Sequence, residues 1–340
     1  MKYLKALLSS ILFLSTFLSL RAEDDSSILL GNSTNRSAYL ISAGTAGAAG
    51  AALCYADATL AAFRGCSISG FRLDLYAPTG EDSLRLFVAR SLDAEPLAEW
   101  VTTGVKKGWN TVTLDMPFTI PDDGPLVMGY EILGARYLRY ADPLLPCEEY
   151  RRVNGGEWQP VKDAMRASFQ AVLTGERLPE RNVLLTWSRL PHYGWMGKDM
   201  RFEGTFVNLG TEVVEEFTVD VSLGDEVLHS EACSTDVVEP RGSGRFAFTV
   251  PTPYRDFLGK LTLAVTQVNG GDDASPGDNL SEVADFMCRK EDFTPRTILM
   301  EEFSTENCTN CPNVHKSVML FAQDRTDIIE VIHHAGFLTD

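Results

Sequence analysis

Long apolar runs and basic residues are both scarce in this chain of 340 residues. After Leu20 no segment approaches the roughly 18 consecutive apolar residues that a transmembrane helix needs, so the sequence predicts no transmembrane segment. Only 30 Lys and Arg stand against 47 Asp and Glu, which gives a net charge of −17. Such a surface repels phosphate groups, and this argues against nucleic acid and anionic membranes as partners.

Common catalytic and cofactor motifs are missing as well. The chain has no Gly-rich phosphate loop, no dinucleotide-binding fingerprint and no Ser/His/Asp ordering. The acidic pairs Asp122-Asp123 and Glu148-Glu149 fall on predicted loops, and nothing places either pair as the acid and base of a glycosidase. We therefore predict no cofactor.

The first 22 residues have the pattern of a secretory signal peptide. Lys2 and Lys5 precede the apolar run Ala6–Leu20, and Ala22 provides a cleavage point before Glu23. Removal of this segment takes away three basic residues and no acid, so the net charge falls from −17 to −20. The sequence predicts an exported protein, located in the periplasm, at the outer membrane surface or outside the cell.

The cysteines are odd in number and scattered, which argues against a disulfide framework for the whole chain. Cys54 and Cys66 lie close together in the sequence and form a candidate pair. Free buried thiols are the alternative, which we favour for the cysteines outside the C-terminal motif. These are Cys54, Cys66, Cys147, Cys233 and Cys288.

Residues 27–176 contain many short segments with a period of two. Phe71, Leu73 and Leu75 alternate with polar residues, and turn sequences such as Asn154-Gly155-Gly156 separate the segments. This pattern predicts a β-sandwich. The motif Gly108-Trp109-Asn110-Thr111-Val112, with Phe169-Gln170-Ala171-Val172-Leu173, resembles the jelly-roll, galactose-binding-like modules of secreted proteins from Gram-negative anaerobes. The resemblance implies an adhesin, a carbohydrate binder or a spacer.

A second β-unit is predicted over residues 181–290, after a linker at Glu176–Glu180. About seven short strands over this length fit a smaller sandwich. The turn Asn208-Leu209-Gly210-Thr211 and the loop that begins at Asn269-Gly270-Gly271 resemble immunoglobulin-like adhesion modules. The resemblance implies a second binding or spacer domain.

The C-terminal segment carries the pattern of a thiol–disulfide site. An apolar strand at Thr297–Phe303 leads to Cys308-x-x-Cys311, and Pro312 fits the first turn of a helix. Val314, Val318 and Phe321 give that helix one apolar face, and a second apolar strand follows at Ile328–Ile332. We expect Cys308 to be the nucleophile and Cys311 the resolving thiol.

This segment resembles thioredoxin-like domains, in particular those with a Cys-x-Asn-Cys-Pro site at the C-terminal end of exported outer-membrane-associated proteins of Gram-negative anaerobes. The resemblance implies that Glu302, six residues before Cys308, accepts the proton of the resolving thiol. Asn307 replaces the usual Trp. Since 29 residues follow Cys311, we expect residues 296–340 to supply the N-terminal part of such a domain, with the chain being a fragment of a longer protein.

Other residues could bind a ligand, but each has an ordinary structural explanation as well. Cys308, Cys311 and His315, with His333 or His334, form a weak alternative zinc set. An acidic loop offers oxygen ligands for calcium, although a solvated turn is favoured; it contains Asp272, Asp273, Asp278 and Asn279. Five tryptophans are candidate sugar platforms, although core packing is favoured; they are Trp100, Trp109, Trp158, Trp187 and Trp195.

The sequence therefore predicts a mainly β protein with two β-sandwiches, jelly-roll-like and then immunoglobulin-like, followed by a partial thioredoxin-like α/β unit. The first functional hypothesis is an exported cell-envelope protein with a thiol–disulfide oxidoreductase module that acts on protein thiols or disulfides. The alternative is a surface adhesion or scaffold protein, with a glycan or protein ligand, whose Cys-x-x-Cys is structural. An insulin-reduction assay and glycan-array binding by residues 27–176 distinguish these hypotheses, and the reading frame after Asp340 tests whether the chain is a fragment.

Overall fold

The computed structural model describes residues 27–42, 47–76, 78, 82–133, 137–290, 297–304, 308–323, 325 and 327–334. The predicted signal peptide lies outside these residues. Within them the chain is mainly β and divides into two compact units, with the boundary between Arg289 and Lys290. None of the described helices is long and apolar enough to cross a membrane.

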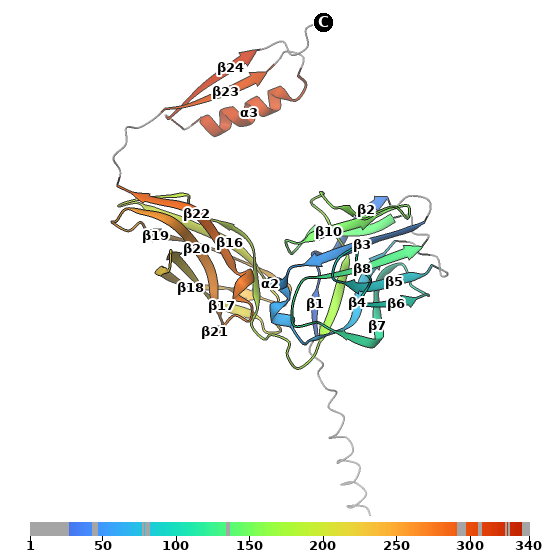
Figure 1. Cartoon of the computed structure of the whole chain (residues 1–340). Coiled ribbons are helices and arrows are strands. Elements are labelled where there is room, and N and C mark those ends of the chain that lie inside the picture. Colours follow the sequence, from blue (N-terminus) through green and yellow to red (C-terminus); the bar gives the residue numbers. More distant parts are fainter. Residues whose placement is uncertain are drawn as a thin grey trace, which may run out of the picture. The chain divides into compact units, whose positions relative to one another are not determined.

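Two sheets face each other in the first part of the larger unit (Figure 1). One contains β1 (Ser27–Leu30), β2 (Ser33–Ser42), β4 (Ser67–Leu75), β7 (Gly108–Thr119), β9 (Tyr137–Pro143), β12 (Arg166–Ala167) and β13 (Phe169–Thr174). The other contains β3 (Ala48–Tyr55), β5 (Leu84–Ala89), β6 (Ala98–Thr102), β8 (Leu126–Leu133), β10 (Glu148–Arg152) and β11 (Gln159–Pro160). A short helical segment, α2 (Asp57–Leu60) with η1 (Ala61–Phe63), follows β3.

Aromatic side chains from both sheets fill the space between them. Tyr130 of β8 and Phe169 of β13 have ring centroids 5.2 Å apart, and Phe71 of β4 lies 6.0 Å from Trp100 of β6. Phe71, Tyr130 and Phe169 are almost completely buried. Two sheets with a shared apolar core confirm the prediction of a sandwich-like, mainly β fold in this part of the chain, and Trp100 packs against its core.

A second pair of sheets follows. The smaller contains β14 (Val183–Arg189), β16 (Asp199–Asn208) and β19 (Ser243–Pro251). The larger contains β15 (Tyr193–Trp195), β17 (Val214–Leu223), β18 (Glu226–Val238), β20 (Phe257–Val268), β21 (Gly271–Asp272) and β22 (Leu280–Arg289), and a 3-10 turn, η2 (Pro276–Asp278), precedes β22. Phe206 of β16 meets Phe217 of β17 at 4.8 Å, so this pair also encloses an apolar core.

The predicted turn after Phe202–Val207 is organised by one buried amide. The Asn208 Nδ2 atom donates to the carbonyls of Glu212 and Val238 at 2.7 and 2.9 Å, and its Oδ1 atom accepts from the Gly210 N–H at 2.9 Å. These bonds satisfy backbone groups that the loop removes from water, which explains an asparagine at this position.

A buried arginine links the two sandwiches within the larger unit. The Arg241 guanidinium donates to the carbonyls of Leu29, Gly31 and Ser33 at 2.7, 3.4 and 2.6 Å. Ser275 adds a second link, since its hydroxyl donates to the Ala58 carbonyl at 2.8 Å. Burial lowers the pKa of Arg241 to about 10, so the side chain remains charged at neutral pH.

The smaller unit contains β23 (Ile298–Ser304), α3 (Cys311–Ala322) and β24 (Ile328–His334) (Figure 1). The strands are parallel, with Ile298 opposite Ile328 and Ser304 opposite His334. This arrangement is the strand–helix–strand order that the sequence predicts.

Candidate functional site

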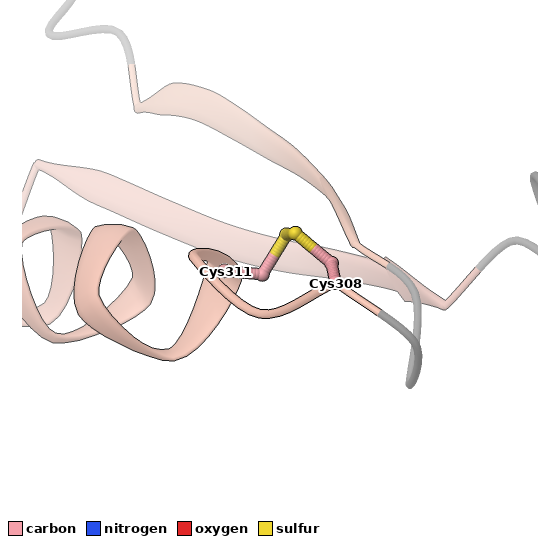
Figure 2. Close-up of a disulfide and its surroundings, with 2 residues drawn as sticks. All are labelled: Cys308 and Cys311. Carbon is pink, nitrogen blue, oxygen red and sulfur yellow. A yellow bond between two sulfur atoms is a disulfide. The ribbon is translucent and has the colours of Figure 1, made fainter.

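The disulfide of the smaller unit lies where its helix begins. Cys308 and Cys311 are bonded to each other, with Cα atoms 5.4 Å apart (Figure 2). Cys311 is the first residue of α3, Asn310 is its N-cap residue, and Pro312 is in its first turn as predicted. Cys308 lies in the preceding loop, three residues before the first residue of α3. Both cysteines are partly exposed.

The helix presents a different face to the sheet from the predicted one. The residues of α3 that are partly buried are Cys311, His315, Val318 and Ala322, which recur at intervals of three and four. Of the apolar face predicted from Val314, Val318 and Phe321, only Val318 is partly buried against the sheet, and Val314 and Phe321 are exposed. The observed face differs because it carries His315, whose imidazole pairs with a carboxylate on β23.

That carboxylate belongs to Glu302, the predicted proton acceptor. Its side chain is only 11% exposed, and its Oε2 atom lies 3.0 Å from His315 Nδ1, within hydrogen-bonding distance. Glu330 of β24 completes the group, with its Oε1 atom 3.7 Å from the same nitrogen. Sequence reasoning missed Glu330, although a carboxylate inside the apolar run Ile328–Ile332 was a signal that could have identified it.

The other face of this sheet carries apolar residues that are open to solvent. Leu299 and Phe303 of β23 and Ile329 of β24 are all more than half exposed. The apolar strand predicted at Thr297–Phe303 is present as β23, but its apolar residues Leu299 and Phe303 are not buried as such a pattern would suggest. A second histidine–glutamate pair lies on the same face: His333 Nε2 is 2.9 Å from Glu301 Oε1, and both side chains are over 40% exposed.

The weak alternative zinc set of Cys308, Cys311 and His315 would require the reduced cysteine pair. Since Cys308 and Cys311 are joined in a disulfide, neither offers a thiolate ligand in this structure. The potential ligand atoms that do cluster belong to Glu302, His315 and Glu330, and all three lie within 4.8 Å of one another.

The other five cysteines are free, which is what the interpretation as separate thiols predicts. The candidate pair Cys54–Cys66 was therefore wrong: Cys54 is on β3, and Cys66 is buried just before β4 of the other sheet. Burial is the main cause that raises the pKa of all five thiols, and this makes them poor nucleophiles; they are Cys54, Cys66, Cys147, Cys233 and Cys288.

The acidic loop holds its residues in different roles. Asp273 is buried, and its two carboxylate oxygens accept from the backbone N–H groups of Val183 and Ser275 at 2.7 and 2.8 Å. Both carboxylate oxygens of Asp278 are buried without a hydrogen-bond partner, and burial, followed by the charge of Asp273, raises its pKa to about 8. Asp272 is exposed. The favoured interpretation as a wholly solvated loop was therefore wrong for Asp273 and Asp278.

A groove of about 890 Å³ lies on the outer face of the β3–β8–β10 sheet. Its lining includes Tyr150, Trp158, Arg90 and Arg152. Trp158 also packs against Phe87, with ring centroids 6.0 Å apart, so it combines a packing role with a surface on the groove. Trp187 is 52% exposed and lines a smaller depression on the second sandwich.

Comparisons with known proteins give structural neighbours only. No protein-family model and no curated protein matches the chain. The CARDB domain of a Pyrococcus furiosus protein, solved with di-metal ions, is 14% identical and has a TM-score of 0.25; the match covers 33% of this chain and 91% of that one. Red sea bream transglutaminase is 14% identical with a TM-score of 0.24, over 63% and 28% of the two chains. A Listeria innocua β-glucosidase in complex with glucose is 16% identical with a TM-score of 0.22, over 32% and 16%. Similarity at this level identifies neither a family nor an activity.

Proposed function

We propose that this chain is an exported cell-envelope protein in which a thioredoxin-like thiol–disulfide module is carried on two β-sandwiches, the first jelly-roll-like and the second immunoglobulin-like. The observation that carries the proposal is the Cys308–Cys311 disulfide at the start of α3, the helix that connects the parallel strands β23 and β24. Export is supported by the basic and apolar pattern of residues 1–22. An exported location favours disulfide chemistry over thiolate metal binding.

The position of the two cysteines suits thiol–disulfide exchange. The first turn of α3 has backbone N–H groups without intrahelical partners, and the positive end of the helix dipole stabilises a nearby thiolate. The five free thiols have raised pKa values and lack such a position. Cys308 and Cys311 are therefore the pair of choice for redox chemistry.

The proposed reaction begins with the reduced pair. The Cys308 thiolate attacks one sulfur of a substrate disulfide, and the departing cysteine thiolate takes a proton from solvent. Cys311 then gives its proton to Glu302, and its thiolate attacks Cys308 Sγ in the mixed disulfide. This step releases the second substrate thiolate and leaves the protein oxidised, with the disulfide that the structure contains. The substrate gains two electrons, and the protein loses two.

Insulin reduction with dithiothreitol tests this proposal on the full chain. We expect the wild type to accelerate the reaction, and Cys308→Ser to remove the acceleration because the nucleophile is lost. Cys233→Ser is the matched control, since this free thiol of β18 has a raised pKa; it should keep the wild-type rate. Equal rates for the wild type and Cys308→Ser would refute the proposed oxidoreductase activity and would favour a structural role for the disulfide.

A second candidate function is glycan or protein binding at a cell surface. The groove lined by Trp158 and Tyr150 favours it, because an aromatic face beside arginine side chains suits a ligand with both apolar and polar groups. Glycan-array binding by the full chain tests this candidate. Binding that Trp158→Ala removes and Trp187→Ala retains would support the groove, and a blank array would exclude a glycan among those displayed.

A further inference from the structure

Three ligand-type side chains meet on the helix-covered face of β23 and β24. Each comes from a different element: Glu302 from β23, His315 from α3 and Glu330 from β24. His315 Nδ1 lies 3.0 Å from Glu302 Oε2 and 3.7 Å from Glu330 Oε1, and all three ligand atoms lie within 4.8 Å of one another.

These distances are close to those around a bound metal ion. Zinc binds imidazole nitrogen at about 2.0–2.1 Å and carboxylate oxygen at about 2.0–2.2 Å, so two ligand atoms on one ion lie roughly 3 to 3.5 Å apart. The two distances from His315 are 3.0 and 3.7 Å. An ion would therefore require only small movements of the two glutamate side chains.

The negative charges of Glu302 and Glu330 also favour a bound cation. Glu302 and Glu330 bring two carboxylates to one imidazole. The Oε1 atom of Glu330 is buried and has no hydrogen-bond partner, because His315 Nδ1 at 3.7 Å is too far away to form one. A buried oxygen without a hydrogen bond is costly. Lys316 lines the same depression as Glu330, but no ion pair among the described residues joins the two. A divalent cation would satisfy both carboxylates at once.

We propose that Glu302, His315 and Glu330 bind a divalent transition-metal ion, with zinc as the best match to one nitrogen and two oxygen ligands. Three protein ligands leave a coordination position for water. The disulfide is closed in this structure, and the site therefore forms without any sulfur ligand.

Metal binding would regulate the disulfide chemistry. This consequence rests on the proposed function, whereas binding itself does not. A Glu302 carboxylate bound to zinc is a weaker proton acceptor, so zinc should slow insulin reduction by the wild type. In Glu330→Gln, Glu302 is intact but the site has lost one ligand, so its activity should resist zinc.

Calorimetric titration of the oxidised full chain with zinc chloride tests the binding. We expect one ion per chain in the wild type, and a loss of affinity of at least about tenfold in Glu330→Gln and in His315→Gln. The matched controls are Glu301→Gln and His333→Gln, which alter the exposed pair on the opposite face of the sheet. Both controls should bind zinc like the wild type.

A second measurement separates this site from a cysteine site. X-ray absorption of the zinc complex should show nitrogen and oxygen neighbours and no sulfur, and the double variant Cys308→Ser, Cys311→Ser should retain the affinity. Wild-type affinity in Glu330→Gln, loss of binding in the double cysteine variant, or no binding by the wild type would each overturn the proposal. If zinc binds but Cys308→Ser reduces insulin like the wild type, the metal site stands and the redox function fails.

Discussion

Replacing Glu149 by glutamine should make the stability of the first sandwich less dependent on pH. Glu149 is on β10, its Oε1 atom accepts from the Ala167 N–H at 2.9 Å, and its Oε2 atom is buried without a partner. Burial raises its pKa from 4.5 to about 7, although the hydrogen bond from Ala167 and the charge of Arg166 act in the opposite direction. Each pKa unit corresponds to about 1.4 kcal/mol, so ionisation of Glu149 lowers the free energy of unfolding by about 3 kcal/mol.

The raised pKa of Glu149 determines the direction in which stability changes with pH. The folded chain holds this proton more tightly than the unfolded chain, so the contribution to stability is complete below pH 4.5 and is lost as the pH rises to about 7. Glutamine carries no charge at any of these pH values. We therefore expect Glu149→Gln to be more stable than the wild type by up to about 3 kcal/mol at pH 8, and within about 1 kcal/mol of it at pH 5.

Urea unfolding at pH 5 and pH 8 measures both differences. Glu148→Gln is the matched control, because Glu148 is the adjacent residue of the same strand and is exposed; its effect should be small at both pH values. An equal effect of Glu149→Gln at pH 5 and pH 8 would refute the assignment of a buried carboxyl group whose ionisation opposes folding.

Two further predictions concern the second sandwich and its junction with the first. Asp278→Asn should stabilise the chain above pH 8 and much less at pH 4, because the pKa of about 8 means that ionisation of Asp278 opposes folding between these pH values. Urea unfolding measures this difference, with the exposed Asp272→Asn as the control. An effect that does not depend on pH would contradict the prediction. Arg241→Met should destabilise the chain by about 2–4 kcal/mol, because it leaves carbonyls of the first sandwich unpaired; an unchanged thermal unfolding midpoint would show that the junction does not depend on this side chain.

The sequence predicted strands better than it predicted which charged groups are buried. In β4, the alternation of Phe71, Leu73 and Leu75 with polar residues indicated the strand, and all three side chains are buried as expected. Asp74 is also buried, near the Arg139 guanidinium at 3.9 Å. A period of two cannot reveal this, because burial of the polar face depends on a strand from elsewhere in the chain.

The same limit applies to Glu149. The sequence placed Glu148-Glu149 on a loop, whereas both residues lie on β10, which pairs with β3 and β11. Glu149 points toward the core and is buried, whereas Glu148 points toward solvent and is exposed. A carboxylate in a core position looks like an ordinary surface residue until the pairing partner is known.

In the candidate site, the sequence identified the reactive atoms but not their surroundings. The cysteines, Pro312 and the two flanking strands carry a local pattern, and the structure has each of them in the predicted order. The side of the helix that faces the sheet is set instead by a non-local contact: His315 of α3 pairs with Glu302 of β23 and Glu330 of β24. Apolar periodicity favoured Val314 and Phe321 for that face, because a hydrophobicity pattern cannot predict a contact between an imidazole and two carboxylates. The observed helix face therefore both differs from the predicted one and creates the group of ligands from which a metal site is inferred.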